Sequence, residues 1–180
     1  MFPPSFNLTE TPLTHWHYYP RSRKAPPLVH AVVQAFRAVA AEIDSEHHNL
    51  PSNGVLARVA PRLVDLGFRV ETGKASDQKI QVPVLFGLDG QYEKSFEVDA
   101  YHEDAGFVLE VEAGRGVVNN QFLKDLFQAC MMNGVTEFAV ALRNDYRGTN
   151  DFEKATRFFD TLYASQRLKL PLAGVLLIGY

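Results

Sequence analysis

The spacing of hydrophobic residues along the chain predicts alternating helices and strands. From residue 27 to about residue 43, apolar residues recur at three- and four-residue steps, which is typical of one face of a helix. The same spacing predicts helices over residues 54–66, 119–132 and 151–166. Pro61 should kink or break the first of these three, because proline lacks the backbone N–H that a helix interior needs. Alternating or continuous apolar runs predict strands at residues 68–71, 79–86, 95–101, 107–112, 137–142 and 173–178.

This order of elements predicts the fold class. Helices that lie between strands supply crossover connections, so we expect an α/β protein with a mixed central sheet flanked by helices. Pro83 favours an edge position for its strand. Residues 1–27 show neither the helical nor the strand periodicity of apolar residues. Each proline in this segment restricts the preceding residue to extended conformations. We therefore predict an N-terminal arm over residues 1–27 and one α/β domain over residues 28–180.

Composition narrows the class of protein. The 180 residues are 46% hydrophobic and 22% charged, which is typical of a folded domain. The net charge of −3 argues against a surface coated with Lys and Arg for indiscriminate nucleic-acid binding. One cysteine, Cys130, excludes an internal disulfide and a cysteine-rich zinc site and favours a reducing compartment. No apolar run approaches a membrane span, so we expect a cytoplasmic protein without a membrane partner.

The most informative stretch is residues 95–112, SFEVDAYHEDAGFVLEVE. Its two halves alternate apolar and polar residues, which predicts two antiparallel strands with one polar face. A turn centred on residues 104 and 105 brings the apolar residues of both strands to the same face. The carboxylates that then lie opposite one another are Asp99 with Glu110 and Glu97 with Glu112.

Opposed carboxylates need an explanation, because like charges directly across a strand pair destabilise it. One explanation is that these acids only solvate the outer face of a hairpin. However, crossover helices would cover that face, and buried acids must be paired or metal-bound. Clustered hard oxygen ligands suit Mg²⁺ or Mn²⁺ better than softer metals.

The order of elements around residues 50–145 resembles the PD-(D/E)xK nuclease superfamily, the fold of type II restriction endonucleases. That family places Asp on the first strand of a hairpin, matched here by Asp99, and (D/E)-x-K on the second, matched by Glu110-Val111-Glu112. Glu112 replaces the usual lysine, as in the E-x-E variant of some restriction endonucleases, and Val98 replaces the proline of the PD pair. The stretch from residue 96 to residue 116 also resembles a segment of uncharacterised bacterial proteins.

The resemblance implies specific roles. Asp99, Glu110 and the backbone carbonyl of Val111 would bind Mg²⁺ or Mn²⁺, and the metal would lower the pKa of a bound water. Glu112 would act as a general base or as a ligand to a second metal. An additional acid often comes from a helix before the sheet in this family. Glu42 and Glu46 are candidates for it, followed by Glu71, or each of them is only a solvated charge, and Glu97 is a further acid of the hairpin itself.

Four other residues could contact the substrate or the reacting groups. Arg115, in a Gly-Arg-Gly loop after the acids, could touch a phosphate, or it could simply be solvated. Gln121 and Lys124 lie one turn apart on the following helix, so both could face the site. Lys79 could supply a displaced catalytic lysine from the neighbouring strand, or it could end that strand in solvent.

The leading hypothesis is a Mg²⁺-dependent DNA endonuclease, with DNA as partner and a homodimer as the form that would suit cutting both strands. A second hypothesis is a non-catalytic DNA-binding or protein-interaction module on the same fold, and a third is a metal-dependent hydrolase of nucleotides. The position of Glu112 relative to Asp99 and Glu110 discriminates the first two. Setting the four hairpin acids aside as metal ligands changes the remaining net charge from −3 to +1, since −3 + 4 = +1.

Overall fold

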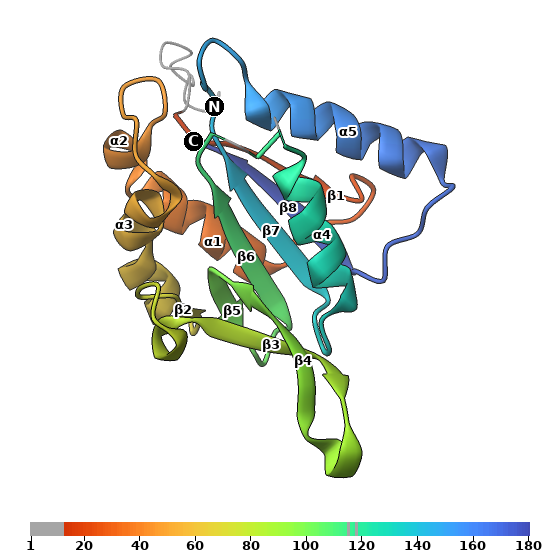
Figure 1. The fold of residues 1–180 in the computed structure, drawn as a ribbon. Helices are drawn as coiled ribbons and strands as arrows, with labels where there is room; N and C mark the ends of the chain where they lie inside the picture. The colour runs from red at the N-terminus through yellow and green to blue at the C-terminus, as the bar shows by residue number, and fades with distance from the viewer. Residues whose placement is uncertain (1–12, 115, 118) are drawn as a thin grey trace, which may run out of the picture.

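A six-stranded mixed sheet forms the central layer of the protein (Figure 1). The computed structural model describes residues 13–114, 116–117 and 119–180. The strands of this sheet are β1 (His15–Tyr19), β2 (Arg69–Val70), β5 (Ala100–His102), β6 (Phe107–Glu112), β7 (Glu137–Leu142) and β8 (Gly174–Gly179). Their order is β1-β8-β7-β6-β5-β2. Strands β6, β7 and β8 run parallel, and the other three are antiparallel to their neighbours.

Helices cover both faces of this sheet. They are α1 (Pro27–Arg37), the short α2 (Ala40–Ile43), α3 (Ser52–Asp65), α4 (Gln121–Met131) and α5 (Asp151–Ser165). Apolar residues of α1 and α3 pack on one face, and those of α4 and α5 pack on the other (Figure 1). The expected fold class, a mixed α/β sheet flanked by helices, is confirmed.

The composition of the central strands explains their position. Every residue of β7 and β8 is buried, and both strands are continuous apolar runs apart from Glu137. Phe138 and Val140 face the α4/α5 core, whereas Ala139 and Ala141 face the α1/α3 core. Strands that are apolar on both faces are stable only where helices cover both faces, which is why β7 and β8 lie in the middle.

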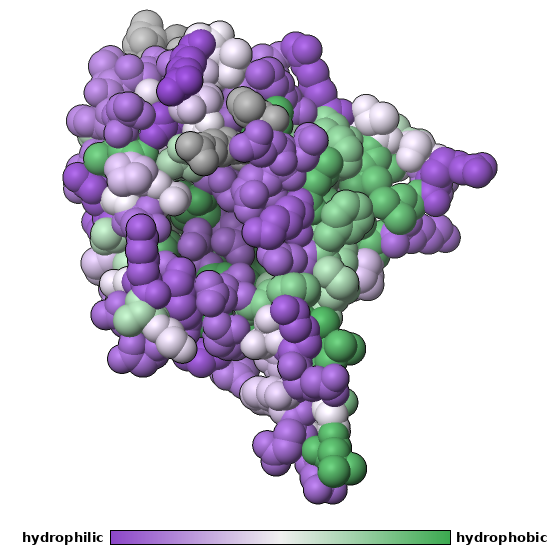
Figure 2. All heavy atoms as spheres, viewed as in Figure 1, coloured by the Kyte–Doolittle hydropathy of each residue, from purple (hydrophilic) through white to green (hydrophobic). Residues whose placement is uncertain are grey.

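A separate hairpin extends from the sheet. Its strands β3 (Ile80–Phe86) and β4 (Tyr92–Val98) pair with each other as a separate two-stranded sheet. Short 3-10 turns, η1 (Ser76–Gln78) and η2 (Leu88–Gly90), precede and close it. The register shifts next to Pro83, as expected for an edge strand that contains proline. Figure 2 shows the protruding hairpin with apolar side chains at its tip, where Leu88 and Tyr92 are exposed.

The expectation that residues 1–27 form an arm outside the core is wrong for the described part of that segment. Residues 15–19 form β1, which pairs antiparallel with β8 along its whole length. Tyr18 is buried in the α1/α3 core and Tyr19 in the α4/α5 core. Sequence periodicity missed this strand because an edge strand acquires its order from pairing with a partner strand far along the chain.

Replacing Tyr18 by phenylalanine tests whether β1 belongs to the folded core. The Tyr18 hydroxyl donates to both Glu137 carboxylate oxygens, at 3.1 and 2.9 Å, where Glu137 is only 9% exposed. The substitution leaves this buried carboxylate without its donor, which costs about 1–3 kcal/mol of unfolding free energy. Urea unfolding should show this loss, and Tyr92→Phe, at an exposed position, should show none. Equal stability of the two variants would mean that β1 detaches easily.

The chain crosses from the hairpin into the central sheet at Asp99, so the single strand expected at residues 95–101 is two strands, β4 and β5. The turn is centred between residues 104 and 105 as predicted, and the register of β5 on β6 agrees with the prediction, with Ala100 opposite Leu109. The predicted pairing of Glu97 with Glu112 is wrong, because Glu97 lies opposite Gln81 of β3.

Two helix predictions also need correction. The helix expected from residue 27 to residue 43 is divided into α1 and α2. Pro61 does not end α3, which continues to Asp65. Among the described residues, no helix combines the length and the apolar character needed to cross a membrane.

Candidate functional site

A small polar pocket of about 210 Å³ opens where β4, β5 and β6 meet, between α3 and α4. In the view of Figure 2, polar side chains gather over this part of the molecule. The pocket is lined by Ser52, Glu71, Lys79, Glu97, Val98, Asp99, Glu110, Val111, Glu112, Gln121, Lys124, Asp125 and Gln128. Six of these residues are acids and two are lysines, so we call it the acid pocket.

The alternation of β6 directs two acids into the acid pocket. Leu109 and Val111 pack into the α1/α3 core, and Val108 packs into the opposite core. Because successive strand residues point to opposite faces, Glu110 and Glu112 lie on the same side as Val108, beneath α4. They thus take positions that would be apolar in a strand covered on both faces, and they remain partly exposed to the pocket.

Asp99 lies at the break between β4 and β5. Its carboxylate Oδ2 accepts a hydrogen bond from the Val111 backbone N–H at 2.8 Å, and its backbone carbonyl accepts one from the Glu71 N–H at 2.8 Å. Since β5 begins only at Ala100, the side chain of Asp99 replaces the next backbone partner of β6. This contact fixes the carboxylate against β6, beside Glu110.

One face of α4 completes the pocket. Gln121, Lys124, Asp125 and Gln128 follow the helical spacing of three and four residues, so they share one face. Asp125 is only 5% exposed, and its Oδ1 accepts a hydrogen bond from Gln121 Nε2 at 3.3 Å. Its Oδ2 is buried without a hydrogen-bond donor among the described residues, and the Glu112 carboxyl lies within hydrogen-bonding reach. These two acids must therefore share a proton or a cation.

The lysine on the opposite wall is also held in place. Lys79 Nζ lies 2.8 Å from Glu71 Oε2 and 3.8 Å from Glu97 Oε2. Hydrogen bonding to Glu71 raises the pKa of Lys79. The ammonium group is thus a fixed positive charge at the rim of the acid pocket, and Lys79 does not end its strand in solvent.

Burial raises the pKa of each acid at the bottom of the pocket. It raises the pKa of Asp99 to about 6, although the hydrogen bond from Val111 opposes the shift. Burial, reinforced by the charge of Asp99, raises the pKa of Glu110 well above its usual range. Burial and the charge of Asp125 raise the pKa of Glu112 to about 8. Burial raises the pKa of Asp125 as well, while the contact with Glu112 opposes that shift.

These shifts predict that the metal-free protein loses stability as pH rises. The folded state keeps protons on Asp99 and Glu112 that an unfolded chain releases near pH 4, so it binds more protons than the unfolded state between about pH 4 and pH 8. Unfolding free energy must fall as pH rises through this window. Thermal unfolding in EDTA should show a lower Tm at pH 8.5 than at pH 5.5.

The acid-pocket variants provide the control for that measurement. Asp99→Asn and Glu112→Gln each remove one raised pKa and should flatten the dependence of Tm on pH. Glu103→Gln, at an exposed position outside the pocket, should leave it unchanged. A Tm that rises with pH in EDTA would contradict the assignment of trapped protons to these carboxyls.

The acid pocket brings together most of the residues predicted from the sequence. Nine of them line it: Glu71, Lys79, Glu97, Asp99, Glu110, Val111, Glu112, Gln121 and Lys124. Glu42 and Glu46 lie elsewhere, exposed on and after α2, so they supply no additional acid to this pocket. Arg115 lies outside the described residues.

Sequence reasoning missed Asp125. The signal was available, because Asp125 lies four residues after Gln121, one turn along the same helix face. The pattern favours a solvated carboxylate at this position, because an acid at the edge of the apolar stripe of a helix is usually solvated. Only packing of α4 against β6 buries this carboxylate next to Glu112.

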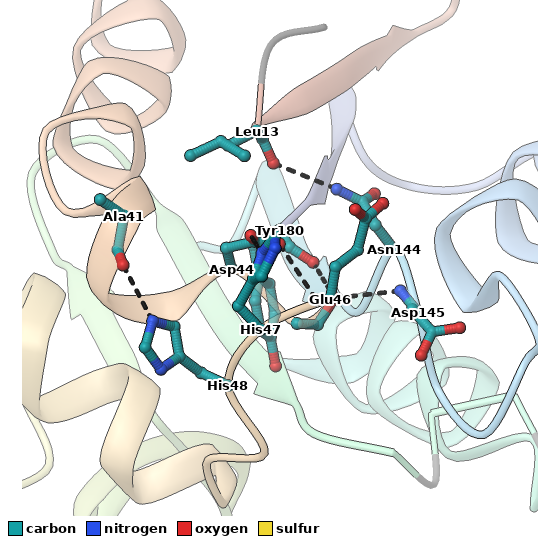
Figure 3. A network of polar contacts seen from close by, with 10 residues as sticks. Leu13, Ala41, Asp44, Glu46, His47, His48, Asn144, Asp145 and Tyr180 are labelled. Carbon is teal, nitrogen blue, oxygen red and sulfur yellow. Dashed lines mark hydrogen bonds and ion pairs between the residues drawn. The ribbon is translucent and has the colours of Figure 1, made fainter.

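A second cluster of ligand-type side chains lies at the end of α2 (Figure 3). Of all the described residues, Asp44, Glu46 and His47 are the only three His, Cys, Asp or Glu residues whose ligand atoms lie within 4.8 Å of one another. Local bonds account for this arrangement: Asp44 Oδ1 accepts from the Glu46 N–H at 3.0 Å, and Asp44 Oδ2 contacts the His47 ring. Glu46 and His47 are exposed.

The residues of the acid pocket fit a divalent cation by their chemistry. They offer carboxylate and carbonyl oxygens, which Mg²⁺ and Mn²⁺ prefer, together with an orphaned buried oxygen on Asp125. Six carboxylates against two lysines also leave an excess of negative charge that a cation would neutralise. No three of these carboxylates lie mutually within 4.8 Å, so a bound ion would rely partly on water ligands, as Mg²⁺ usually does.

Comparison with known proteins supports the fold. The chain is similar to the crystal structure of restriction endonuclease BglII complexed with a DNA 16-mer, with a TM-score of 0.53 and 12% sequence identity over 92% of this chain and 77% of that chain. No family model matches the sequence, and no curated protein matches it significantly. At this identity the similarity shows a restriction-endonuclease-like fold.

Proposed function

We propose that this protein is a metal-dependent nuclease that hydrolyses phosphodiester bonds of DNA, as a member of the PD-(D/E)xK superfamily with an E-x-E variant motif. The observation that carries the proposal is that Asp99, Glu110 and Glu112 line one pocket on a restriction-endonuclease-like fold. The similar structure holds DNA, which agrees with DNA as the substrate.

Asp99, Glu110 and the Val111 carbonyl would hold Mg²⁺ or Mn²⁺. A bound divalent ion would neutralise the scissile phosphate and lower the pKa of a coordinated water. The Val111 N–H orients the Asp99 carboxylate for this role, and Glu110 lies partly buried beside it on β6. Without a cation, the same carboxylates would repel a phosphodiester.

Glu112 takes the position of the usual lysine and would accept a proton from the attacking water. A general base works best with a pKa near the working pH, and burial raises the pKa of Glu112 to about 8. Its contact with Asp125 offers a second carboxyl that can take up the proton. Lys79, fixed by Glu71 with Glu97 nearby, would supply positive charge at the rim, a role in which it partly replaces the missing lysine.

Lys124 and Gln121 would contact the phosphate backbone from α4, because both line the pocket on its solvent side. Arg115 remains a candidate for the same role. A homodimer would suit cutting both strands of a duplex, and the single cysteine fits a reducing, cytoplasmic setting.

A second function is favoured by one observation. Glu112 contacts Asp125, and the carboxylates of the pocket are more widely spaced than a compact three-ligand site. A non-catalytic DNA-binding or protein-interaction module that kept these acids as a proton-sharing cluster would show the same arrangement. Activity and metal binding distinguish the two functions.

The test is incubation of the purified protein with supercoiled and linear plasmid in Mg²⁺, in Mn²⁺ and in EDTA. We expect nicking or linearisation in one or both metals and none in EDTA. Single-stranded DNA and RNA of matched sequence establish which polymer is cut. No cleavage in either metal, together with DNA binding, would favour the non-catalytic module, and equal cleavage in EDTA would contradict the metal-dependent mechanism.

A further inference from the structure

A larger cavity of about 490 Å³ lies next to the acid pocket and plays no part in the proposed metal site. It is lined by Ser45, Asn49, Pro51, Ala113, Arg143, Asp145, Tyr146 and Arg147. These residues come from the loop before α3, the end of β6 and the loop after β7. Its lining includes two arginines and one carboxylate, so we call it the arginine cavity.

Arg143 is the central group of the arginine cavity. Its side chain lies 5% exposed, and it follows directly after the buried strand β7. Its Nη1 donates to Asn49 Oδ1 at 2.8 Å, its Nη2 donates to the Leu50 carbonyl, and its guanidinium lies 5.5 Å from the centre of the Tyr146 ring. All three of these partners are uncharged, and together they fix the plane of the guanidinium.

The charge of Arg143 has no direct counterion in the part of the chain that the structure describes. None of the ion pairs found there includes Arg143, and its Nε is buried without a hydrogen-bond partner. The Asp151 carboxyl lies within electrostatic range but not within ion-pairing distance. A buried cation without an anion is costly, so a guanidinium fixed in the wall of a cavity favours the binding of an anion there.

Arg147 adds a second positive charge from the same loop. Its guanidinium lies 5.3 Å from the centre of the Tyr146 ring, so one tyrosine contacts both arginines. Arg147 is exposed, whereas Arg143 is buried. The cavity therefore combines one buried, fixed guanidinium with one exposed guanidinium, and Asp145 is the one carboxylate among the described residues that line it.

The arginine cavity and the acid pocket share two walls. Along β6, Glu112 lines the acid pocket and the next residue, Ala113, lines the arginine cavity. At the start of α3, Ser52 lines the first and Pro51 the second. The Tyr180 hydroxyl contacts the end of β6 at this point, since it donates to the Glu112 carbonyl at 3.0 Å.

Other polar groups fix the far wall. Ser45 Oγ accepts from the Asp145 backbone N–H at 3.0 Å and donates to the Tyr180 carbonyl. These contacts belong to the network drawn in Figure 3, in which Asp145 and Tyr180 come from separate elements. The loop that carries Arg143 and Arg147 is thereby tied to the loop after α2, which preorganises the cavity before any ligand enters.

We infer that the arginine cavity binds a phosphate of the nucleic-acid strand next to the phosphate held at the acid pocket. This inference rests on the proposed function and specifies how its substrate is positioned. Arginine binds phosphate with paired donors, and phosphate contacts fix the register of a strand without reading its sequence. The cation-binding pocket and the anion-binding cavity thus hold adjacent parts of one strand.

The test is binding of a fluorescein-labelled duplex in EDTA, measured by anisotropy over a series of NaCl concentrations. Arg147→Gln and Arg143→Lys are expected to weaken binding about tenfold, which corresponds to the loss of one charge-assisted hydrogen bond. For Arg147→Gln the slope of log K against log [salt] should fall by about 0.9, which is one phosphate contact. Arg143→Lys keeps its charge and should change affinity with little change of slope.

Arg157→Gln is the matched control, because Arg157 is exposed on α5 and pairs with Glu153. It should bind like the wild type. Wild-type affinity and slope in Arg147→Gln, with a cooperative unfolding transition, would overturn the inference. A rise of Tm in sodium phosphate over sodium chloride at equal ionic strength, without any effect of Arg147→Gln on duplex binding, would assign the cavity to free phosphate and overturn it as well.

Measuring in EDTA separates this inference from the proposed nuclease activity. If Arg147 contributes to duplex binding but the protein cuts no DNA in any metal, the inference about the arginine cavity stands and the proposed nuclease activity is wrong. If the protein cuts DNA and both arginine variants bind the duplex like the wild type, the proposed nuclease activity stands and the inference about the arginine cavity is wrong.

Discussion

Replacing Glu110 by glutamine is expected to reduce metal-dependent DNA cleavage by about 100-fold or more, while Tm in EDTA at pH 8 stays the same or rises. Changes in groups that only orient metal ligands already cost about 10–100-fold, so loss of a ligand belongs at the upper end or beyond. Plasmid cleavage and thermal unfolding of the same preparations measure the two effects. Asp99→Asn should behave in the same way.

The physical reason for these opposite effects is electrostatic. Burial and the charge of Asp99 raise the pKa of Glu110, so its ionised form is destabilising in the folded protein without metal. Glutamine has nearly the same shape and no charge, and the repulsion disappears together with the ligand. Asparagine at residue 99 can still accept the Val111 N–H through its side-chain oxygen, so the contact with β6 is retained.

Two controls sharpen this prediction. Glu103→Gln removes an exposed carboxylate outside the acid pocket and should change neither cleavage nor Tm. Glu112→Gln distinguishes the two roles considered for Glu112, general base and metal ligand. Loss of cleavage with metal binding retained would identify Glu112 as the base. Cleavage that survives both Asp99→Asn and Glu110→Gln would remove the acid pocket from the mechanism.

Mn²⁺ at about 100 times its dissociation constant is expected to raise Tm at pH 8 by roughly 5–10 °C. A ligand at that concentration adds about 2.7 kcal/mol to unfolding free energy, and each kcal/mol shifts the Tm of a chain of this size by roughly 2–4 °C. At a fixed Mn²⁺ concentration the rise in Tm should be largest above pH 8, where Glu112 and Asp99 are ionised and protons no longer compete with the metal. Differential scanning calorimetry with and without Mn²⁺ measures it.

The variants also decide between the two candidate cation sites. Glu110→Gln and Asp125→Asn should abolish most of the Mn²⁺-dependent shift, because both carboxylates line the acid pocket. Asp44→Asn disrupts the Asp44, Glu46 and His47 cluster and should leave the shift intact. The reverse pattern would place the cation at the end of α2 and contradict the proposed metal site.

Much of the acid pocket could be predicted from local pattern. Strands β6 and β7 have the predicted bounds, because their apolar residues alternate or run continuously without a proline or glycine to interrupt them. The pairing register of β5 and β6 followed from requiring Ala100 and Leu109 to share a core face. These features depend on side-chain period and turn length, which neighbouring residues determine.

Other features depend on partners far along the chain. Strand β1 has its order from pairing with β8, more than 150 residues later, so local periodicity could not reveal it. Glu97 does not lie opposite Glu112 as predicted, because the chain crosses from one sheet to the other at Asp99. The alternation of apolar and polar residues continues through this point and does not indicate the crossing. Arg143 ends an apolar strand, and nothing near it in the sequence indicates that Asn49 and Tyr146 enclose it.

The sequence by itself determined α3, α4, α5, the central strands and the identity of the hairpin carboxylates, since each is encoded by the spacing of residues within about one element. Only the tertiary structure decided that Asp125 lies beside Glu112, that Glu42 and Glu46 stay outside the acid pocket, and that Arg143 is buried away from direct ion pairing with any described carboxylate. Burial and charge at a site depend on which surfaces pack together, and packing joins residues whose separation along the chain carries no local signal.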